Sequence, residues 1–380
     1  MNYRSLLKPE NLFLLIIFFL GFFFFKFSIN EFWDFFLVPN NKDLNFSDLR
    51  CLQKFDDYNY FFYDSKNLYN IKDRCSYFNY PRLWILVSSF LELKNNFNLY
   101  IFFSIQIFTY IGIFFYLIKK FNSFFFLYLF FSGSSLLLIE RGNIDLIIFI
   151  ISFFVLNINY NILIIFLYLL AVLLKLFPFF GILGIFNKLK NFKVNFFILI
   201  FSLSYFFISY RDIFSISNNT PKTGDMSYGL LAVKLNLMKK LNLDFNYFYI
   251  LLTVLFIVLI VYFLFRKYFL QDTDIRYKSS FLFGSLIYLA TFVINTHFDY
   301  RLVFIFFIIP SVLFFKNKYL KYSILVTTFL SLELNRLIEL FGIIGGFLNN
   351  LSKVCLFILL SCVILNLISD YVFKNKNGKA

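Results

Sequence analysis

The chain has 380 residues, of which 60% are hydrophobic, and its formal net charge is +15. This much apolar sequence excludes a water-soluble globular protein and predicts an all-α polytopic membrane protein. In a soluble protein such a charge would suggest nucleic acid, but in a membrane protein it reflects Lys and Arg in cytoplasmic loops, so we expect no nucleic-acid partner.

The basic residues form short clusters between apolar runs, and these clusters set the predicted topology. Lys and Arg concentrate in cytoplasmic loops, and a crossing helix needs about 20 apolar residues. If every cluster lies in the cytoplasm, the chain must cross the membrane an even number of times between any two of them. This condition predicts about 12 transmembrane helices, within a range of about 10 to 13, with both termini in the cytoplasm. The clusters are Arg4 and Lys8; Lys119 and Lys120; Lys188, Lys190 and Lys193; Arg266, Lys267, Arg276 and Lys278; Lys316, Lys318 and Lys321; and Lys374, Lys376 and Lys379.

The first apolar run, about 11–28, follows Arg4 and Lys8, so its far end is expected outside. No small-residue cleavage site follows it, which predicts a retained anchor. Residues 29–96 then form a long first extracytoplasmic loop with short amphipathic helices, including "PRLWILVSSFLEL", and the run 97–118 returns to the cytoplasmic side.

The stretch 135–152, "SLLLIERGNIDLIIFIIS", contains Glu140, Arg141, Asn143 and Asp145 within apolar sequence. Each ion at the centre of a span costs about 2.5 to 3.5 kcal/mol, so three cost roughly 9 kcal/mol. A single span is therefore excluded. We predict two membrane segments joined by a tight charged hairpin on the outer side.

After this hairpin the apolar runs become short. Three short or tilted crossings over 146–158, 162–175 and 177–186 are favoured over one long crossing. The remaining predicted spans are 194–210, 248–265, 279–295, 302–315, 322–334 and 352–373. A second large extracytoplasmic loop is expected at 211–247, with further outer loops at 295–301 and 335–351, and residues 1–380 are predicted to form a single domain.

Groups of mixed charge gather at the outer ends of the predicted spans. Any one pair is most simply an interface salt bridge, but ionisable groups at membrane depth usually face a cavity, and six outer ends together predict one. The groups are Asp48 and Arg50; Glu140, Arg141 and Asp145; Lys175; Arg211; His297, Asp299 and Arg301; and Glu333 and Arg336.

Other sequence signatures restrict the chemistry. There is no Gly-rich phosphate loop and no zinc-protease motif, so no cofactor is required by the sequence. His297 is the sole histidine, which excludes a multi-His metal site, although Asp48, Asp299 and His297 could share a divalent metal if they converge. Cys51 and Cys75 share the first outer loop, where an oxidising compartment would permit a disulfide.

Five fragments occur in a characteristic order: "DLRCLQ…DRCSYFNYPRLW", "ERGNIDLIIF", "LLKLFP", "NTPKTGDMSYG" and "NTHFDYRLVF". This set, from about 45 to 310, resembles a bacterial membrane group related to glycosyltransferase family 87 of the GT-C superfamily. The resemblance implies a GT-C-like helical bundle in the bacterial cytoplasmic membrane with an extracytoplasmic active site. It implies a polyprenyl-phosphate-sugar donor and a catalytic acidic residue in the first outer loop.

By this resemblance Asp48 is the candidate general base, and Asp56 and Asp57 are its competitors in a solvated turn. The expected activity is inverting sugar transfer to a glycolipid or cell-envelope glycan. Arg301, Lys175 and Arg141 are candidates to hold the donor phosphate, while Arg50, Glu140, Asn143, Asp145, His297 and Asp299 are further candidates for binding the donor. The alternatives are a transporter or flippase of lipid-linked saccharides, for which no internal repeat is visible, and a non-catalytic membrane scaffold.

Overall fold

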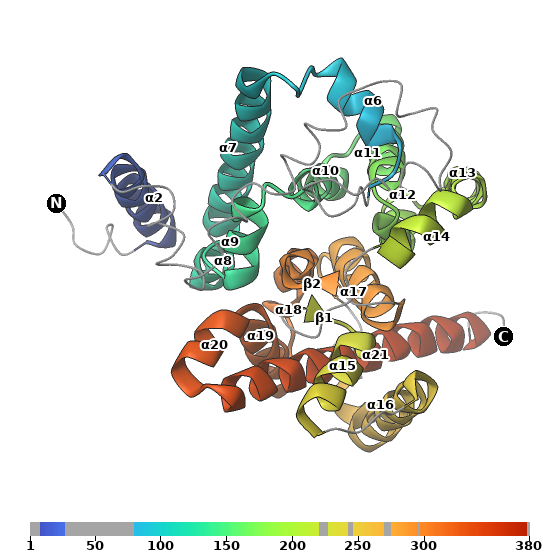
Figure 1. The fold of residues 1–380 in the computed structure, drawn as a ribbon. Helices are drawn as coiled ribbons and strands as arrows, with labels where there is room; N and C mark the ends of the chain where they lie inside the picture. The colour runs from blue at the N-terminus through green and yellow to red at the C-terminus, as the bar shows by residue number, and fades with distance from the viewer. Residues whose placement is uncertain are drawn as a thin grey trace. The chain divides into compact units, whose positions relative to one another are not determined.

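The structure is a computed structural model that describes residues 8–26, 80–219, 227–241, 246–269, 275–294 and 297–377. Within these ranges the chain is almost wholly helical (Figure 1). A two-stranded antiparallel sheet pairs β1 (Ser227–Tyr228) with β2 (His297–Phe298). Several residues singled out by the sequence lie outside the described residues: Arg4, Asp48, Arg50, Cys51, Asp56, Asp57, Cys75 and Lys379.

The described chain divides into two compact units that interleave along the sequence. Unit 1 comprises residues 1–178 and 193–221, and unit 2 comprises residues 179–192 and 222–380. The chain therefore passes between the units three times. The single domain expected from the sequence stays a prediction.

Unit 1 is built from one long helix, α7, and several shorter helices. Its helices are α2 (Pro9–Lys26), α6 (Leu83–Phe90), α7 (Asn96–Phe121), α8 (Phe124–Phe130), α9 (Gly133–Glu140), α10 (Asp145–Asn157), α11 (Asn161–Leu174), α13 (Phe192–Ile208) and α14 (Tyr210–Asn219).

Polar residues between these helices stop one helix and start the next. Asn95 caps α7 by accepting a hydrogen bond from the Phe97 N–H at 2.9 Å, and α7 ends at Asn122, which has a left-handed backbone. Ser123 and Ser132 cap α8 and α9 in the same way. Such side-chain acceptors satisfy N–H groups that have no partner within the helix. The core of unit 1 is aromatic, with Tyr110 and Phe149 at 5.4 Å between ring centroids.

Unit 2 is arranged around α17 (Lys278–Ile294), which packs against α12, α18, α21 and the 3₁₀ helix η4. Its other elements are α12 (Ile182–Leu189), α15 (Leu230–Leu241), α16 (Tyr247–Phe269), η4 (Asp299–Phe307), α18 (Ile309–Val312), α19 (Lys318–Leu332), α20 (Leu334–Phe341) and α21 (Ile343–Asn377); η2 (Phe177–Gly181) precedes α12. Gly184 permits the close approach of α12 to α17, because a Cβ there would lie 2.5 Å from the Ser279 carbonyl oxygen.

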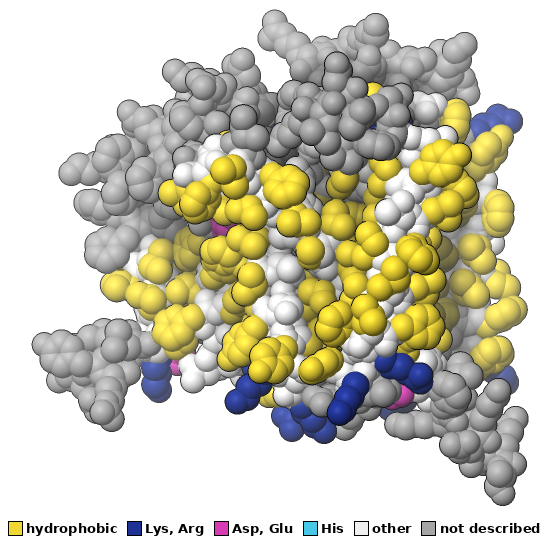
Figure 2. Space-filling model, turned by 90° about the horizontal axis from the view of Figure 1, so that it is seen from below, with side chains coloured by type: hydrophobic (Ala, Val, Ile, Leu, Met, Phe, Trp, Pro, Cys, Tyr) yellow, Lys and Arg dark blue, Asp and Glu magenta, His cyan; other side chains and the backbone are white. Residues whose placement is uncertain are grey.

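Among the described residues, three helices are long and apolar enough to cross a membrane: Asn96–Phe121, Tyr247–Phe269 and Ile344–Asp370. A fourth span results if α13 and α14, which are bent by 63°, count as one. Large apolar side chains such as Phe196 and Phe263 are exposed on these helices, and Figure 2 shows a broad band of hydrophobic side chains on one face. The expectation of an all-α, membrane-embedded protein with several spans is confirmed. The number of about twelve stays a prediction.

The three short segments predicted over 146–186 are present as the short helices α10, α11 and α12, and their crossing of the membrane stays a prediction. Two other regions differ locally from the sequence-based expectation. The predicted span 302–315 is not one regular α-helix but η4 followed by α18, because Pro310 lacks the N–H that a continuous helix needs. The predicted loop 335–351 is helical, as α20 and the start of α21, with Gly342 at φ 56° between them.

Candidate functional site

The helix break at residues 141–144 is closed by a Schellman turn. Gly142 has φ 58°, its N–H donates to the Ile139 carbonyl at 3.0 Å, and the Asn143 N–H donates to the Leu138 carbonyl at 3.2 Å. These two bonds satisfy carbonyls at the end of α9. The Asn143 Oδ1 then accepts from the Asp145 N–H at 2.8 Å, which starts α10. The turn therefore keeps the polar residues of this break next to the ends of two helices.

The polar side chains of the break are withdrawn from solvent. Asn143 and Asp145 are fully buried, and Glu140 is buried at the last position of α9. Asp145 forms an ion pair with Lys175, the residue that follows α11. Because α10 and α11 are consecutive helices packed against each other, the start of α10 lies beside the end of α11. Both residues were named from the sequence as donor-binding candidates, and the structure pairs them with each other within unit 1.

Aromatic rings also surround the ammonium group of Lys175. Its Nζ lies 5.0 Å from the centre of the Tyr80 ring and 6.0 Å from that of Phe177. A cation over an aromatic face is attracted by the ring quadrupole. The Lys175 side chain keeps 11% of its exposure, whereas Asp145 has none. The positive partner is therefore the more accessible member of this pair.

Further polar contacts gather at the end of α11. The Trp84 Nε1–H donates to the Leu174 carbonyl at 2.8 Å, and the Tyr205 hydroxyl donates to the Leu173 carbonyl at 3.0 Å. These bonds satisfy carbonyls that the helix itself leaves without partners. We call Tyr80, Trp84, Asp145, Lys175 and the break residues Glu140, Arg141 and Asn143 the α11-end cluster.

A second ion pair in unit 1 is partly buried. Arg82, just before α6, binds Asp212 of α14 through two contacts, Nε–Oδ2 at 2.7 Å and Nη2–Oδ1 at 3.1 Å. Their side chains are 21% and 15% exposed. This bidentate pair joins two segments that are 130 residues apart in the chain.

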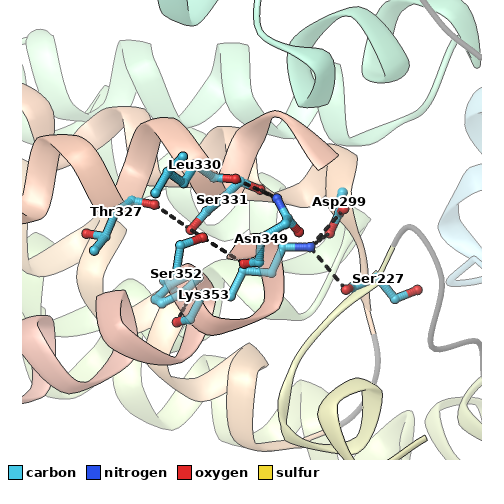
Figure 3. A network of polar contacts seen from close by, with 9 residues as sticks. Ser227, Asp299, Thr327, Leu330, Ser331, Asn349, Ser352 and Lys353 are labelled. Carbon is cyan, nitrogen blue, oxygen red and sulfur yellow. Dashed lines mark hydrogen bonds and ion pairs between the residues drawn. The ribbon is translucent and has the colours of Figure 1, made fainter. Parts of the chain in front are cut away.

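Unit 2 contains a second Asp–Lys pair, in a more enclosed setting (Figure 3). The Lys353 Nζ, on α21, lies 2.7 and 2.9 Å from the two carboxylate oxygens of Asp299 and 3.2 Å from the Ser227 carbonyl. Side-chain exposure is 1% for Lys353 and 6% for Asp299. Burial raises the pKa of the Asp299 carboxyl, and the neighbouring Lys353 ammonium counteracts this rise. Three acceptors thus surround an ammonium group that has three N–H donors.

Hydrogen bonds extend from this pair along α19 and α21. Asn349 Nδ2 donates to the Leu330 carbonyl at 2.6 Å, and the hydroxyls of Ser331 and Ser352 lie 3.1 Å apart. The Tyr288 hydroxyl donates to the Lys353 carbonyl at 2.7 Å. We call Ser227, Asp299, Lys353, Tyr288, Ser331, Asn349 and Ser352 the unit 2 network. It fastens β1, η4, α17, α19 and α21 to one another.

His297 and Arg301 also meet in unit 2, but Asp299 pairs elsewhere. The Arg301 guanidinium contacts the Nδ1 of His297, and the His297 ring lies 5.7 Å from that of Tyr228. A guanidinium has no acceptor, so this contact requires a neutral imidazole with its lone pair on Nδ1. The predicted donor-binding residues that the structure describes, which leaves out Arg50, fall into two sets: Glu140, Arg141, Asn143, Asp145 and Lys175 in unit 1, and His297, Asp299 and Arg301 in unit 2.

Sequence reasoning missed Lys353, Arg82, Asp212 and the aromatic residues Tyr80 and Trp84. Lys353 carried a signal, because it is a single cation inside the apolar stretch Ile344–Asp370, and ionisable residues there normally have a partner. Arg82 and Trp84 lie in the fragment "PRLW", but nothing in a linear pattern indicates contacts with Asp212 or Leu174.

Within the described ranges, no three His, Cys, Asp or Glu side chains lie close enough together to hold a metal ion. Asp48 lies outside those ranges, so the metal site shared by Asp48, Asp299 and His297 is still untested. The same holds for the disulfide between Cys51 and Cys75.

Comparison with known proteins finds no matching family model, no similar curated protein and no similar solved structure. The resemblance to glycosyltransferase family 87 therefore rests on the ordered sequence fragments alone.

Proposed function

We propose that the protein is an inverting membrane glycosyltransferase of the GT-C type. It transfers a sugar from a polyprenyl-phosphate-linked donor to a glycolipid or cell-envelope glycan acceptor, at the outer face of a bacterial cytoplasmic membrane. The ordered fragments in the sequence suggest this function. The observation that carries it is the burial of the Asp145–Lys175 pair at the end of α11, beside Arg141 and Glu140.

The composition of the α11-end cluster supports this proposal. Burying ions is costly, and replacing a buried ion pair by apolar residues is often neutral or stabilising, so such a pair is weak evidence for a structural role. A lipid-linked phosphate is anionic and needs cations at membrane depth. Lys175 retains partial exposure and Arg141 is half-buried, so the cluster offers two cations to such a group.

The chemistry follows from these assignments. The carboxylate of Asp48 accepts the proton of the acceptor hydroxyl as its oxygen attacks the anomeric carbon. The bond from that carbon to the phosphate oxygen breaks, and the electron pair leaves with the polyprenyl phosphate. Lys175 and Arg141 stabilise the charge on this leaving group. The lipid phosphate is a good leaving group, so one carboxylate suffices.

Two measurements test the proposal. Mass spectrometry of membrane glycolipids and cell-wall glycans, with and without the gene, should reveal a missing sugar. Purified protein in nanodiscs, supplied with a panel of polyprenyl-phosphate-linked hexoses, should then transfer that sugar. Asp48→Asn should lower the rate by about 10² to 10⁴.

Asp56→Asn is the matched control, because it removes a carboxylate of the same loop. It should leave transfer close to wild type. Transfer that survives Asp48→Asn but not Asp56→Asn would assign the base to Asp56. Movement of the lipid-linked sugar across vesicles without any transfer would support a transporter instead.

A further inference from the structure

One end of unit 2 carries a dense set of cations on four helix termini. They occur at the end of α12, the end of α16, the start of α17 and the region joining α18 to α19. The set, which we call the basic end, is Lys188, Lys190, Arg266, Lys267, Arg276, Lys278, Lys316, Lys318 and Lys321. Figure 2 shows Lys and Arg gathered along one edge of the hydrophobic band.

Specific contacts hold these helix ends together. Asn317 caps α19 by accepting from the N–H groups of Tyr319 and Leu320, and its Nδ2 donates to the Tyr268 carbonyl at the end of α16. Asn317 is buried. It therefore fixes Lys318 close to Arg266 and Lys267, which belong to a helix about 50 residues earlier in the chain.

Similar contacts join the start of α17 to α18, to the residues after α18 and to the end of α12. The Ser311 hydroxyl donates to the Tyr277 carbonyl at 3.2 Å, and the Arg276 guanidinium lies 5.0 Å from the centre of the Phe314 ring. Asn187 Nδ2 donates to the Ser279 hydroxyl at 2.8 Å. The cations are thus presented by one packed surface rather than by separate loops.

The charge of this surface is strongly unbalanced. Asp299 lies at the start of η4 and Glu333 at the end of α19, so both are at the opposite ends of their segments from the basic end. Among the described residues, Asp370 near the end of α21 carries a carboxylate on the same side. The sequence between α16 and α17 contains two more, Asp272 and Asp274, which the structure does not describe. The cations outnumber the carboxylates even when all three are counted.

Exposed aromatic residues border the cations. Tyr268, Phe314, Tyr319 and Tyr322 are exposed by 43% or more. Tyr side chains favour the level of lipid headgroups, where their rings are in apolar surroundings and their hydroxyls are wet. The apolar side chains Phe263 and Leu264 precede Arg266 on α16. Cations bordered by exposed aromatic residues and preceded by apolar side chains are the pattern of helix ends at the depth of the headgroups.

We propose that the basic end of unit 2 is a docking surface for the phosphate headgroups of anionic phospholipids in the membrane leaflet that it faces. Each Lys or Arg at such a surface attracts anionic lipid, and basic sites formed by several helix ends select for anionic headgroups. This inference does not depend on the proposed function.

The test compares lipid binding by the full-length protein and two triple variants. Native mass spectrometry measures the affinities for phosphatidylglycerol and phosphatidylcholine. The first variant, Arg266→Gln/Lys267→Gln/Lys318→Gln, removes three exposed cations of the basic end. The control, Lys8→Gln/Lys119→Gln/Lys120→Gln, removes three exposed cations of unit 1.

Wild-type protein should prefer phosphatidylglycerol, and added salt should weaken this preference. In the first variant this preference for phosphatidylglycerol should fall by at least about fivefold, which is the effect of removing one cation from a membrane surface. The control should lose clearly less of the preference, because Lys8, Lys119 and Lys120 belong to unit 1 and are not among the cations that the contacts above gather at the basic end. Equal losses in both variants, or no wild-type preference for phosphatidylglycerol, would overturn the proposal.

Discussion

The α11-end cluster of unit 1 and the unit 2 network both centre on a buried Asp–Lys pair, but they enclose their ammonium groups differently. Lys353 faces three oxygen acceptors and has 1% side-chain exposure. The Lys175 ammonium pairs with the Asp145 carboxylate and lies near the rings of Tyr80 and Phe177, and its side chain keeps 11% exposure. The same pair of residue types therefore fastens helices in unit 2, whereas in unit 1 its cation is the more exposed of the two, as our proposal of a phosphate-binding role requires.

The largest expected effect is on stability in unit 2. Lys353→Met leaves the buried Asp299 carboxylate without its cation, so it should lower the free energy of unfolding by about 3 to 5 kcal/mol. Lys175→Met should cost less although Asp145 is fully buried, because the 11% exposure of Lys175 gives water access to the position that its ammonium group leaves. Thermal unfolding of the detergent-solubilised variants measures both. A larger loss for Lys175→Met would reverse the comparison.

A smaller effect is expected at the turn that forms the α9–α10 break. Gly142 has φ 58°, where a side chain costs about 1 to 2 kcal/mol, so Gly142→Ala should destabilise the protein by that amount. Gly112→Ala is the control, because it lies within α7 with no atom within 4 Å of the added Cβ. That change should stabilise by about 0.5 to 1 kcal/mol. Shifts of the same sign would contradict the assignment of the turn.

The smallest expected stability effects come from two single hydrogen bonds, one per unit. Trp84→Phe removes the bond to the Leu174 carbonyl, and Tyr288→Phe removes the bond to the Lys353 carbonyl. Each should cost about 0.5 to 1.5 kcal/mol. Sugar transfer should fall in Trp84→Phe and stay near wild type in Tyr288→Phe. A loss of transfer in Tyr288→Phe alone would place the active site in unit 2.

Much of the helical pattern could be predicted from the sequence, because apolar runs and charged breaks are local signals. The cost of burying Glu140, Arg141 and Asp145 correctly located a helix break, and the sequence correctly placed Lys175 at the end of an apolar segment. Local pattern failed at 302–315, where Pro310 interrupts the helix, and at 335–351, where a predicted loop is helical.

The pairing of charges could not be predicted, because it depends on which helix ends meet. Asp299 and Arg301 lie at the same predicted outer span end, yet the Asp299 carboxylate binds Lys353, 54 residues later in the chain. Arg82 and Asp212 are 130 residues apart. Such contacts follow from packing of whole helices, which no short motif encodes. The position of Asp48 lies outside the described residues, so its role rests on the sequence resemblance.

The most direct test of the central claim removes both charges of each pair. Asp145→Asn/Lys175→Met and Asp299→Asn/Lys353→Met each avoid a stranded ion, so both double variants should fold with stabilities close to wild type. Transfer from polyprenyl-phosphate-linked sugar should then fall by at least about tenfold in the first variant, the loss of one charge-assisted contact to phosphate. It should persist in the second. Transfer that survives in the first variant, or is lost in the second while the protein remains folded, would contradict the distinction between the two pairs.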